Sequence, residues 1–131
     1  MATKHEVLKW QVVTDWSVNS RGRMYCMNQG LATPINGDHP IWFGPLKRNF
    51  KGFPDLFGFE QITILDMDGE CADICPIFTV IEVKVPPDRP SKSQILVMNS
   101  LVDFGCMAYI AEADDNAEPG YNLIKWEDYR R

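Results

Sequence analysis

The stretch Ile77-Phe-Thr-Val-Ile-Glu-Val-Lys-Val-Pro-Pro87 decides the fold of this chain. Its Val, Ile, Phe and Thr residues predict a buried strand, yet the same run contains Glu82 and Lys84. Successive side chains of a strand point to opposite faces, so these two charged side chains project from the same face. Burying a charge is costly unless it has a partner or a metal. We therefore expect Glu82 and Lys84 to form part of a site, with a purely structural ion pair as the alternative.

A second carboxylate follows a Gly/Pro turn upstream, in Lys51-Gly-Phe-Pro-Asp-Leu-Phe-Gly-Phe59. Because proline opens a strand but does not occupy its middle, Asp55 is expected at the start of a strand. If this strand pairs with the one that carries Glu82, the two carboxylates converge. Two carboxylates, water and a backbone carbonyl make a set of oxygen ligands that suits Mg²⁺ or Mn²⁺. Lys84 would then hold a nucleophilic water or offset charge on a phosphate.

At these residues the chain resembles the PD…(D/E)xK nuclease superfamily, through Pro54-Asp55 and Glu82-Val83-Lys84. It is most similar to VRR-NUC-type domains and to archaeal Holliday junction resolvases, because four features occur in their order. These are an early helix with a Glu, a Gly-x-Pro-Asp turn, an Ile-Glu-Val-Lys strand, and a helix with Gln94 that leads into another strand. The resemblance covers residues 4–112, and the long segment between Asp55 and Glu82 departs from the pattern.

The resemblance implies one domain over residues 1–131 with an α/β (α+β) fold, a restriction-endonuclease-like core in which helices flank a mixed central β-sheet. It implies an endonuclease that uses Mg²⁺ or Mn²⁺ to hydrolyse DNA phosphodiester bonds, selects branched or Holliday junction DNA, and acts as a homodimer. In that scheme Asp55, Glu82 and the Val83 carbonyl hold the metal ion. Lys84 orients or helps to deprotonate the attacking water.

Two further residues match positions that reach the active site in the resembled family. Glu6 lies on the first helix, but Thr3 three residues earlier makes a capping box the alternative role. Gln94 lies in the first turn of a later helix, where a surface glutamine is the alternative. His5, beside Glu6, is expected to be an exposed helix residue rather than a base.

The net charge of −5 and the pI near 4.9 are unusual for a protein that contacts phosphates. The charge is unevenly distributed, however, because residues 1–59 carry +3 and residues 60–131 carry −8. The candidate DNA-contacting residues, each with a solvated loop or surface as the alternative, are Arg21, Arg23, Lys47, Arg48, Lys51 and Lys92.

Periodicity and turn residues predict the remaining elements. We expect an amphipathic helix over residues 4–13, two short strands within residues 17–49, and a strand over residues 61–65 followed by an acidic turn. A helix capped by Ser91 and ended by Gly105 should lead into a strand over residues 106–111, which completes a β-α-β crossover. A short helix or strand is expected near the C-terminus.

The length of 131 residues, with 45% hydrophobic residues, is enough for one domain with its own core. No apolar run is long enough to span a membrane and the four cysteines show no secretory pattern, so we expect a soluble intracellular, cytoplasmic protein with reduced thiols, from a prokaryote or a phage.

Two other functions stay open. One is a nuclease-fold protein that binds DNA or assembles without cutting; the other is a restriction-type nuclease, for which the chain has little room.

Overall fold

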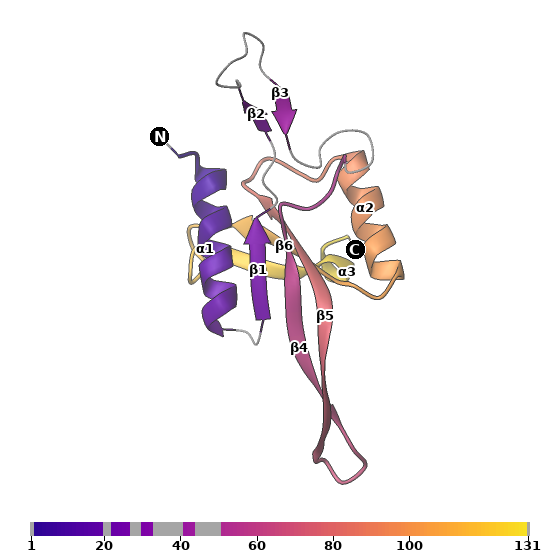
Figure 1. Cartoon of the computed structure of the whole chain (residues 1–131). Helices are drawn as coiled ribbons and strands as arrows, with labels where there is room; N and C mark the ends of the chain where they lie inside the picture. The colour runs from indigo at the N-terminus through magenta and orange to yellow at the C-terminus, as the bar shows by residue number, and fades with distance from the viewer. Residues whose placement is uncertain (1, 20–21, 27–29, 33–40, 44–50, 131) are drawn as a thin grey trace.

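A computed structural model describes residues 2–19, 22–26, 30–32, 41–43 and 51–130 of the chain. Five strands form a mixed sheet in the order β1-β4-β5-β6-β7, and β2 and β3 pair separately (Figure 1). The elements are α1 (Lys4–Asn19), β1 (Gly22–Cys26), β2 (Gly30–Ala32), β3 (Ile41–Phe43), β4 (Leu56–Leu65), β5 (Cys71–Lys84), α2 (Lys92–Asp103), β6 (Met107–Ala113), β7 (Tyr121–Lys125) and α3 (Trp126–Tyr129).

The sheet is built around β5, which pairs antiparallel with β4 on one side and parallel with β6 on the other. Helix α2 connects β5 to β6, which is the predicted β-α-β crossover. Residues 79–83 of β5 are buried, because both faces of the sheet are covered at this point. The expected restriction-endonuclease-like α+β core, a mixed sheet flanked by helices, is confirmed.

The two faces of the sheet are covered by different helices (Figure 1). On one face, Leu8, Val12 and Trp16 of α1 pack against a cluster that includes Ile81 and Val83 of β5. On the other face, residues of α2 and α3 pack over the alternate residues of the same strands in a second cluster of buried residues, Val80, Met98, Ala108 and Trp126.

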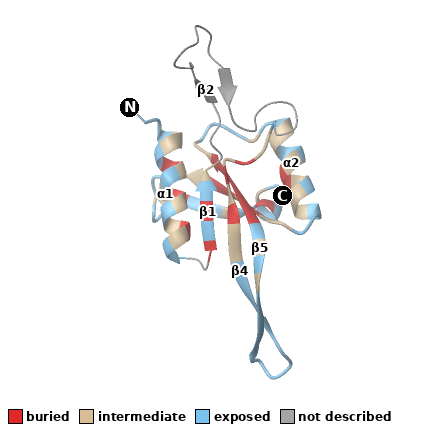
Figure 2. Ribbon diagram, in the orientation of Figure 1, coloured by how far each residue is buried: buried red, intermediate tan, exposed pale blue. Residues whose placement is uncertain are grey.

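The long segment between Asp55 and Glu82 is an extended β-hairpin. Strands β4 and β5 stay paired from Leu56 opposite Ile81 to Ile64 opposite Asp73, and the hairpin runs beyond the helices into solvent (Figure 2). Its predicted acidic turn is closed by the Asp66 carboxylate, which accepts bonds of 2.9 Å from the backbone N–H groups of Asp68 and Glu70. The long segment therefore keeps β4 and β5 paired along their length, and Asp55 and Glu82 lie opposite each other at one end of that pair.

Several predicted elements differ in extent from the structure. Helix α1 continues to Asn19, well past residue 13, because Trp16 extends its buried stripe. The described part of residues 17–49 contains three short strands rather than two, and the terminal segment forms both a strand and a helix. No helix among the described residues is long and apolar enough to cross a membrane.

The turn before β4 packs closely on the start of α2 at Gly52, which has a φ of 86°. A Cβ atom at this position would lie 2.6 Å from the Ser93 carbonyl carbon and 2.9 Å from the Gln94 nitrogen. Substitution G52A therefore combines a left-handed backbone with a steric clash, and we expect a loss of about 2–4 kcal/mol in the free energy of unfolding.

Chemical denaturation of G52A should be compared with that of Gly69→Ala. Gly69 has a similar φ of 80°, but apart from its chain neighbours no atom of the described residues lies within 4 Å of the added Cβ. In Gly69→Ala the free energy of unfolding should fall only by the cost of the left-handed backbone, about 1–2 kcal/mol. Equal losses in the two variants would contradict the close packing of the Gly52 turn on α2.

Candidate active site

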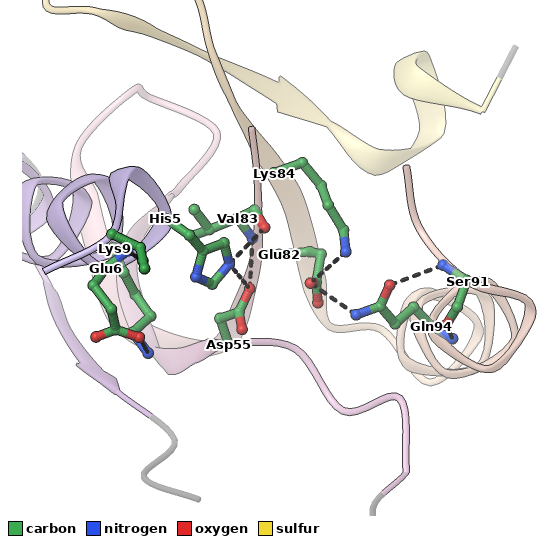
Figure 3. A network of polar contacts seen from close by, with 10 residues as sticks. His5, Glu6, Lys9, Asp55, Glu82, Val83, Lys84, Ser91 and Gln94 are labelled. Atoms are coloured by element: carbon green, nitrogen blue, oxygen red, sulfur yellow. Dashed lines mark hydrogen bonds and ion pairs between the residues drawn. The ribbon is translucent and has the colours of Figure 1, made fainter. Parts of the chain in front are cut away.

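The two carboxylates of the Pro-Asp turn and the central strand lie side by side at one end of the sheet (Figure 3). Since Leu56 pairs with Ile81, the preceding residue Asp55 is opposite Glu82. The Glu82 side chain is only 1% exposed, and the Asp55 side chain, immediately before β4, is 18% exposed. Adjacent strands thus bring together two carboxylates that are 27 positions apart in the chain.

The Asp55 carboxylate is held in one orientation by two donors. Its Oδ2 atom accepts a 2.9 Å hydrogen bond from the Val83 backbone N–H and lies 3.4 Å from the His5 Nε2 atom. Burial by itself raises the pKa of Asp55, but the His5 and Val83 hydrogen bonds outweigh burial and keep this pKa below its usual value. Asp55 is therefore ionised at neutral pH.

The environment of Glu82 has the opposite effect. Burial, followed by the negative charge of Asp55, raises the pKa of Glu82 to about 9, although Lys84 opposes the shift. Its Oε1 atom accepts a 3.0 Å bond from Gln94 Nε2 and lies 3.5 Å from Lys84 Nζ. Its buried Oε2 atom has no hydrogen-bond partner among the described residues. Without an added positive charge, Glu82 carries a proton at neutral pH.

Gln94 was expected to reach the site or to be a surface glutamine, and its side chain both caps α2 and contacts Glu82. Its Oε1 atom accepts a 2.8 Å bond from the Ser91 backbone N–H, and its backbone N–H donates to Ser91 Oγ, so it completes the capping box of α2. Its amide nitrogen remains free to donate to Glu82. The start of α2 is thereby tied to the central strand through one side chain (Figure 3).

His5 was expected on the exposed surface of its helix, but it contacts the site. Its side chain is 38% exposed, and its Nε2 atom lies 3.1 Å from the Val83 carbonyl oxygen and close to Asp55. The hydrogen bond with Asp55 raises the pKa of His5. The sequence signal for this position is helical spacing, because His5 precedes the buried residues Leu8 and Val12 by three and seven positions and so shares their face.

Glu6 points elsewhere. Its backbone N–H donates to Thr3 Oγ1 at 3.1 Å, and its carboxylate pairs with Lys9 Nζ at 3.0 Å (Figure 3). The bond to Thr3 is one of the two bonds of the expected capping box, and the role of Glu6 at a metal site stays a prediction. Across the parts of the chain that the structure describes, no group of three or more His, Cys, Asp or Glu side chains is arranged to hold a metal ion.

The structure describes only some of the candidate DNA-contacting residues. Arg21, Lys47 and Arg48 lie outside the described residues. Lys51, Lys92 and Arg23 are exposed. Because Gly52 packs on Ser93, the neighbouring Lys51 and Lys92 both lie at the start of α2, near Gln94. Arg23 lies on the edge strand β1.

The family described as VRR-NUC domain matches residues 8–115 of the chain. The match includes Asp55, Glu82, Lys84 and Gln94 and begins after His5 and Glu6. No curated protein and no solved structure matches the chain. Since the matched residues make up most of the sequence, and the fold and the paired carboxylates agree with them, the chain belongs to the VRR-NUC family of nuclease domains.

Proposed function

We propose that this nuclease domain is a metal-dependent endonuclease that hydrolyses DNA phosphodiester bonds at the Asp55–Glu82 pair. The observation that carries the proposal is the raised pKa of Glu82 together with its unpartnered, buried Oε2 atom among the described residues. Lys84 offsets only part of the burial and repulsion that disfavour the charge of Glu82 beside Asp55. A divalent cation would supply further positive charge and would displace the proton of Glu82.

The residues at this position fit such an ion. Carboxylate oxygens of Asp55 and Glu82 and the carbonyl oxygen of Val83 would hold it, and these oxygen ligands suit Mg²⁺ or Mn²⁺. When bound, the ion would lower the pKa of a coordinated water and offset negative charge on the scissile phosphate.

The chain's own residues prepare the site for hydrolysis. The Val83 N–H and His5 hold one oxygen of Asp55 and so fix the direction of the other. Gln94, at the start of α2, donates a hydrogen bond to Glu82 and so helps to fix the position of its carboxyl group. The amine of Lys84, whose side chain is 14% exposed, is close enough to hold the attacking water and to stabilise charge on the phosphate.

We further propose that the preferred substrate is branched DNA, including Holliday junctions, and that the enzyme acts as a homodimer. Nuclease domains of this family typically select DNA by structure, which supports the first part. A two-fold dimer would match the two-fold symmetry of a four-way junction, which supports the second part.

The test is cleavage of labelled four-way junction, flap and linear duplex DNA with Mg²⁺ or Mn²⁺, with a chelator and with Lys84→Met as controls. Cutting that disappears with the chelator and falls sharply in the variant is the expected result. If folded protein that binds Mn²⁺ cuts none of these substrates, the alternative of an inactive nuclease-fold protein that binds DNA or assembles would replace the proposal.

His5 provides a separate test of how Asp55 is oriented. We expect His5→Ala to weaken Mn²⁺ binding about 10–100-fold, as is usual when a partner that orients a metal ligand is removed. His5→Gln should keep most of the affinity, because its amide nitrogen can take the place of Nε2 and donate to Asp55 Oδ2. Titration calorimetry measures both variants, and tighter binding by His5→Ala would show that His5 competes with the metal for the Val83 carbonyl.

A further inference from the structure

Aromatic side chains continue the active-site face of the sheet down the long hairpin. Strand alternation places Phe78 and Val80 on the same face of β5 as Glu82 and Lys84. Cross-strand partners share a face, so the pairing of the strands adds residues of β4 and β1 to it. Moving away from Asp55 and Glu82, the successive rows are Tyr25–Phe57–Val80, Arg23–Phe59–Phe78 and Gln61–Pro76.

Four of these residues, Tyr25, Phe57, Phe59 and Phe78, form an open surface that we call the aromatic platform. Tyr25 is 52% exposed and Phe78 is 41% exposed. The four rings line a shallow hollow of about 620 Å³ together with Gln61 and Pro76. On the same face of the sheet, Met98 of helix α2 packs on Val80. The hollow lies farther along the hairpin from the candidate site than this contact.

The distribution of charge on the hairpin suits an anionic ligand on this face. Apart from Glu82 in the candidate site, the acidic residues of the hairpin's paired strands are Glu60 and Asp73, which lie opposite Ile77 and Ile64 and thus point to the other face. On the platform face the row of Phe59 and Phe78 ends in Arg23, whose side chain is exposed. Because the turn that begins at Asp66 is acidic, an anionic ligand is favoured only on the half of the hairpin nearer the active site.

We propose that the aromatic platform binds unpaired bases of the DNA substrate, as a single-stranded segment that leads away from the cleavage site. This inference rests on the proposed function and specifies the substrate of the same site. Aromatic rings flanked by a cation bind single strands because every base can stack on a ring, whatever its sequence. Arg23 would contact the phosphates of that segment.

The spacing of the rows favours a single strand over a duplex. Rows of side chains on one face of a strand are about 7 Å apart, since they are two residues apart. Neighbouring bases of one strand in a duplex are about 3.4 Å apart, so only an extended and unstacked strand can place successive bases on successive rows. A second copy of the chain is the competing occupant, but the shared face with Glu82 and the presence of Arg23 favour DNA.

The test measures binding of fluorescein-labelled oligothymidylate and of a duplex of equal length, by fluorescence anisotropy in the presence of a chelator. We expect Phe78→Ala and Phe78→Leu each to weaken binding of the single strand about tenfold, because both remove a stacking surface. Phe78→Trp should retain binding, and binding of the duplex should change little. Ile62→Ala is the matched control, since Ile62 is an exposed apolar residue on the opposite face of the same hairpin.

The outcomes separate this inference from the proposed function. If the wild type binds or cuts DNA but the Phe78 variants bind oligothymidylate normally, the platform assignment is wrong and the nuclease function stands. If Phe78→Leu binds normally while Phe78→Ala alone loses binding and also dissociates a dimer in light scattering, the surface is an apolar contact between two copies. If the wild type neither binds nor cuts any of the DNA substrates, both proposals fail.

Discussion

Substitution E82Q is expected to abolish DNA cleavage and, at the same time, to stabilise the fold at alkaline pH. The glutamine keeps an oxygen that can accept from Gln94, but it cannot supply the second negative charge that a divalent ion needs. Loss of a residue that only orients a ligand costs about 10–100-fold, so we expect loss of the ligand itself to lower the cleavage rate by more than about 100-fold.

The gain in stability has the same physical origin as the loss of activity. Glu82 is buried beside Asp55, and its ionised form is disfavoured in the folded chain, as its pKa of about 9 shows. A neutral side chain of the same shape avoids that penalty, and we expect a gain of about 1–4 kcal/mol in the free energy of unfolding near pH 8. Chemical denaturation in the presence of a chelator measures it.

Glu60→Gln is the matched control, because it makes the same chemical change on β4, on the face of the hairpin opposite the site. It should leave both the cleavage rate and the stability close to those of the wild type. Wild-type cleavage by E82Q would remove Glu82 from the metal site. A loss of stability in E82Q would mean that repulsion between the Asp55 and Glu82 carboxylates does not destabilise the fold.

The sequence predicted the elements that local patterns determine. The apolar run around Glu82 marked the central strand, Pro54 marked the start of the strand after Asp55, and Ser91 and Gly105 marked the ends of α2. Each of these signals lies within a few residues of the feature that it predicts. The order of the motifs then indicated the fold and the pairing of the two carboxylates, which the structure has.

Features that depend on tertiary packing could not be predicted in this way. Helical spacing places His5 on the buried face of α1, but only the packing of α1 on the sheet brings it to Val83, 78 positions away in the chain. The platform depends on the pairing of β1 with β4 and of β4 with β5, which puts Arg23 beside Phe59 and Phe78. Single positions within an extended strand carry no sign of which residue will lie beside them.

The side chain of Gln94 both caps a helix and contacts a carboxylate of the candidate site. A glutamine has an oxygen and a nitrogen, and the capping box of α2 uses only the oxygen of this side chain. The nitrogen then donates to Glu82, so the same residue fixes the helix start and a carboxylate of the site. Substitution at this position would therefore affect both the local fold and the site.

In the absence of metal, the free energy of unfolding of the wild type should fall as the pH rises from 5 to 9, as the pKa of about 9 for Glu82 implies. The folded chain keeps the Glu82 proton in this range, whereas the unfolded chain releases it near the usual value of 4.5. The raised pKa of His5 acts in the same direction, since its contribution is lost as the pH rises through the folded-state value. Asp55, with a lowered pKa, changes stability only below about pH 5.

Added Mn²⁺ should offset a large part of this decline, because the ion binds the ionised form of Glu82 and so gains affinity as the proton leaves. Titration of Glu82 alone can lower the free energy of unfolding by at most about 1.4 kcal/mol per pH unit. A metal concentration of about 100 times the Kd would restore about 2.7 kcal/mol. Denaturation series between pH 5 and 9, with and without Mn²⁺, should therefore diverge for the wild type and coincide for E82Q. If the wild-type series coincide as well, no divalent ion replaces the Glu82 proton, and the metal-dependent mechanism would have to be abandoned.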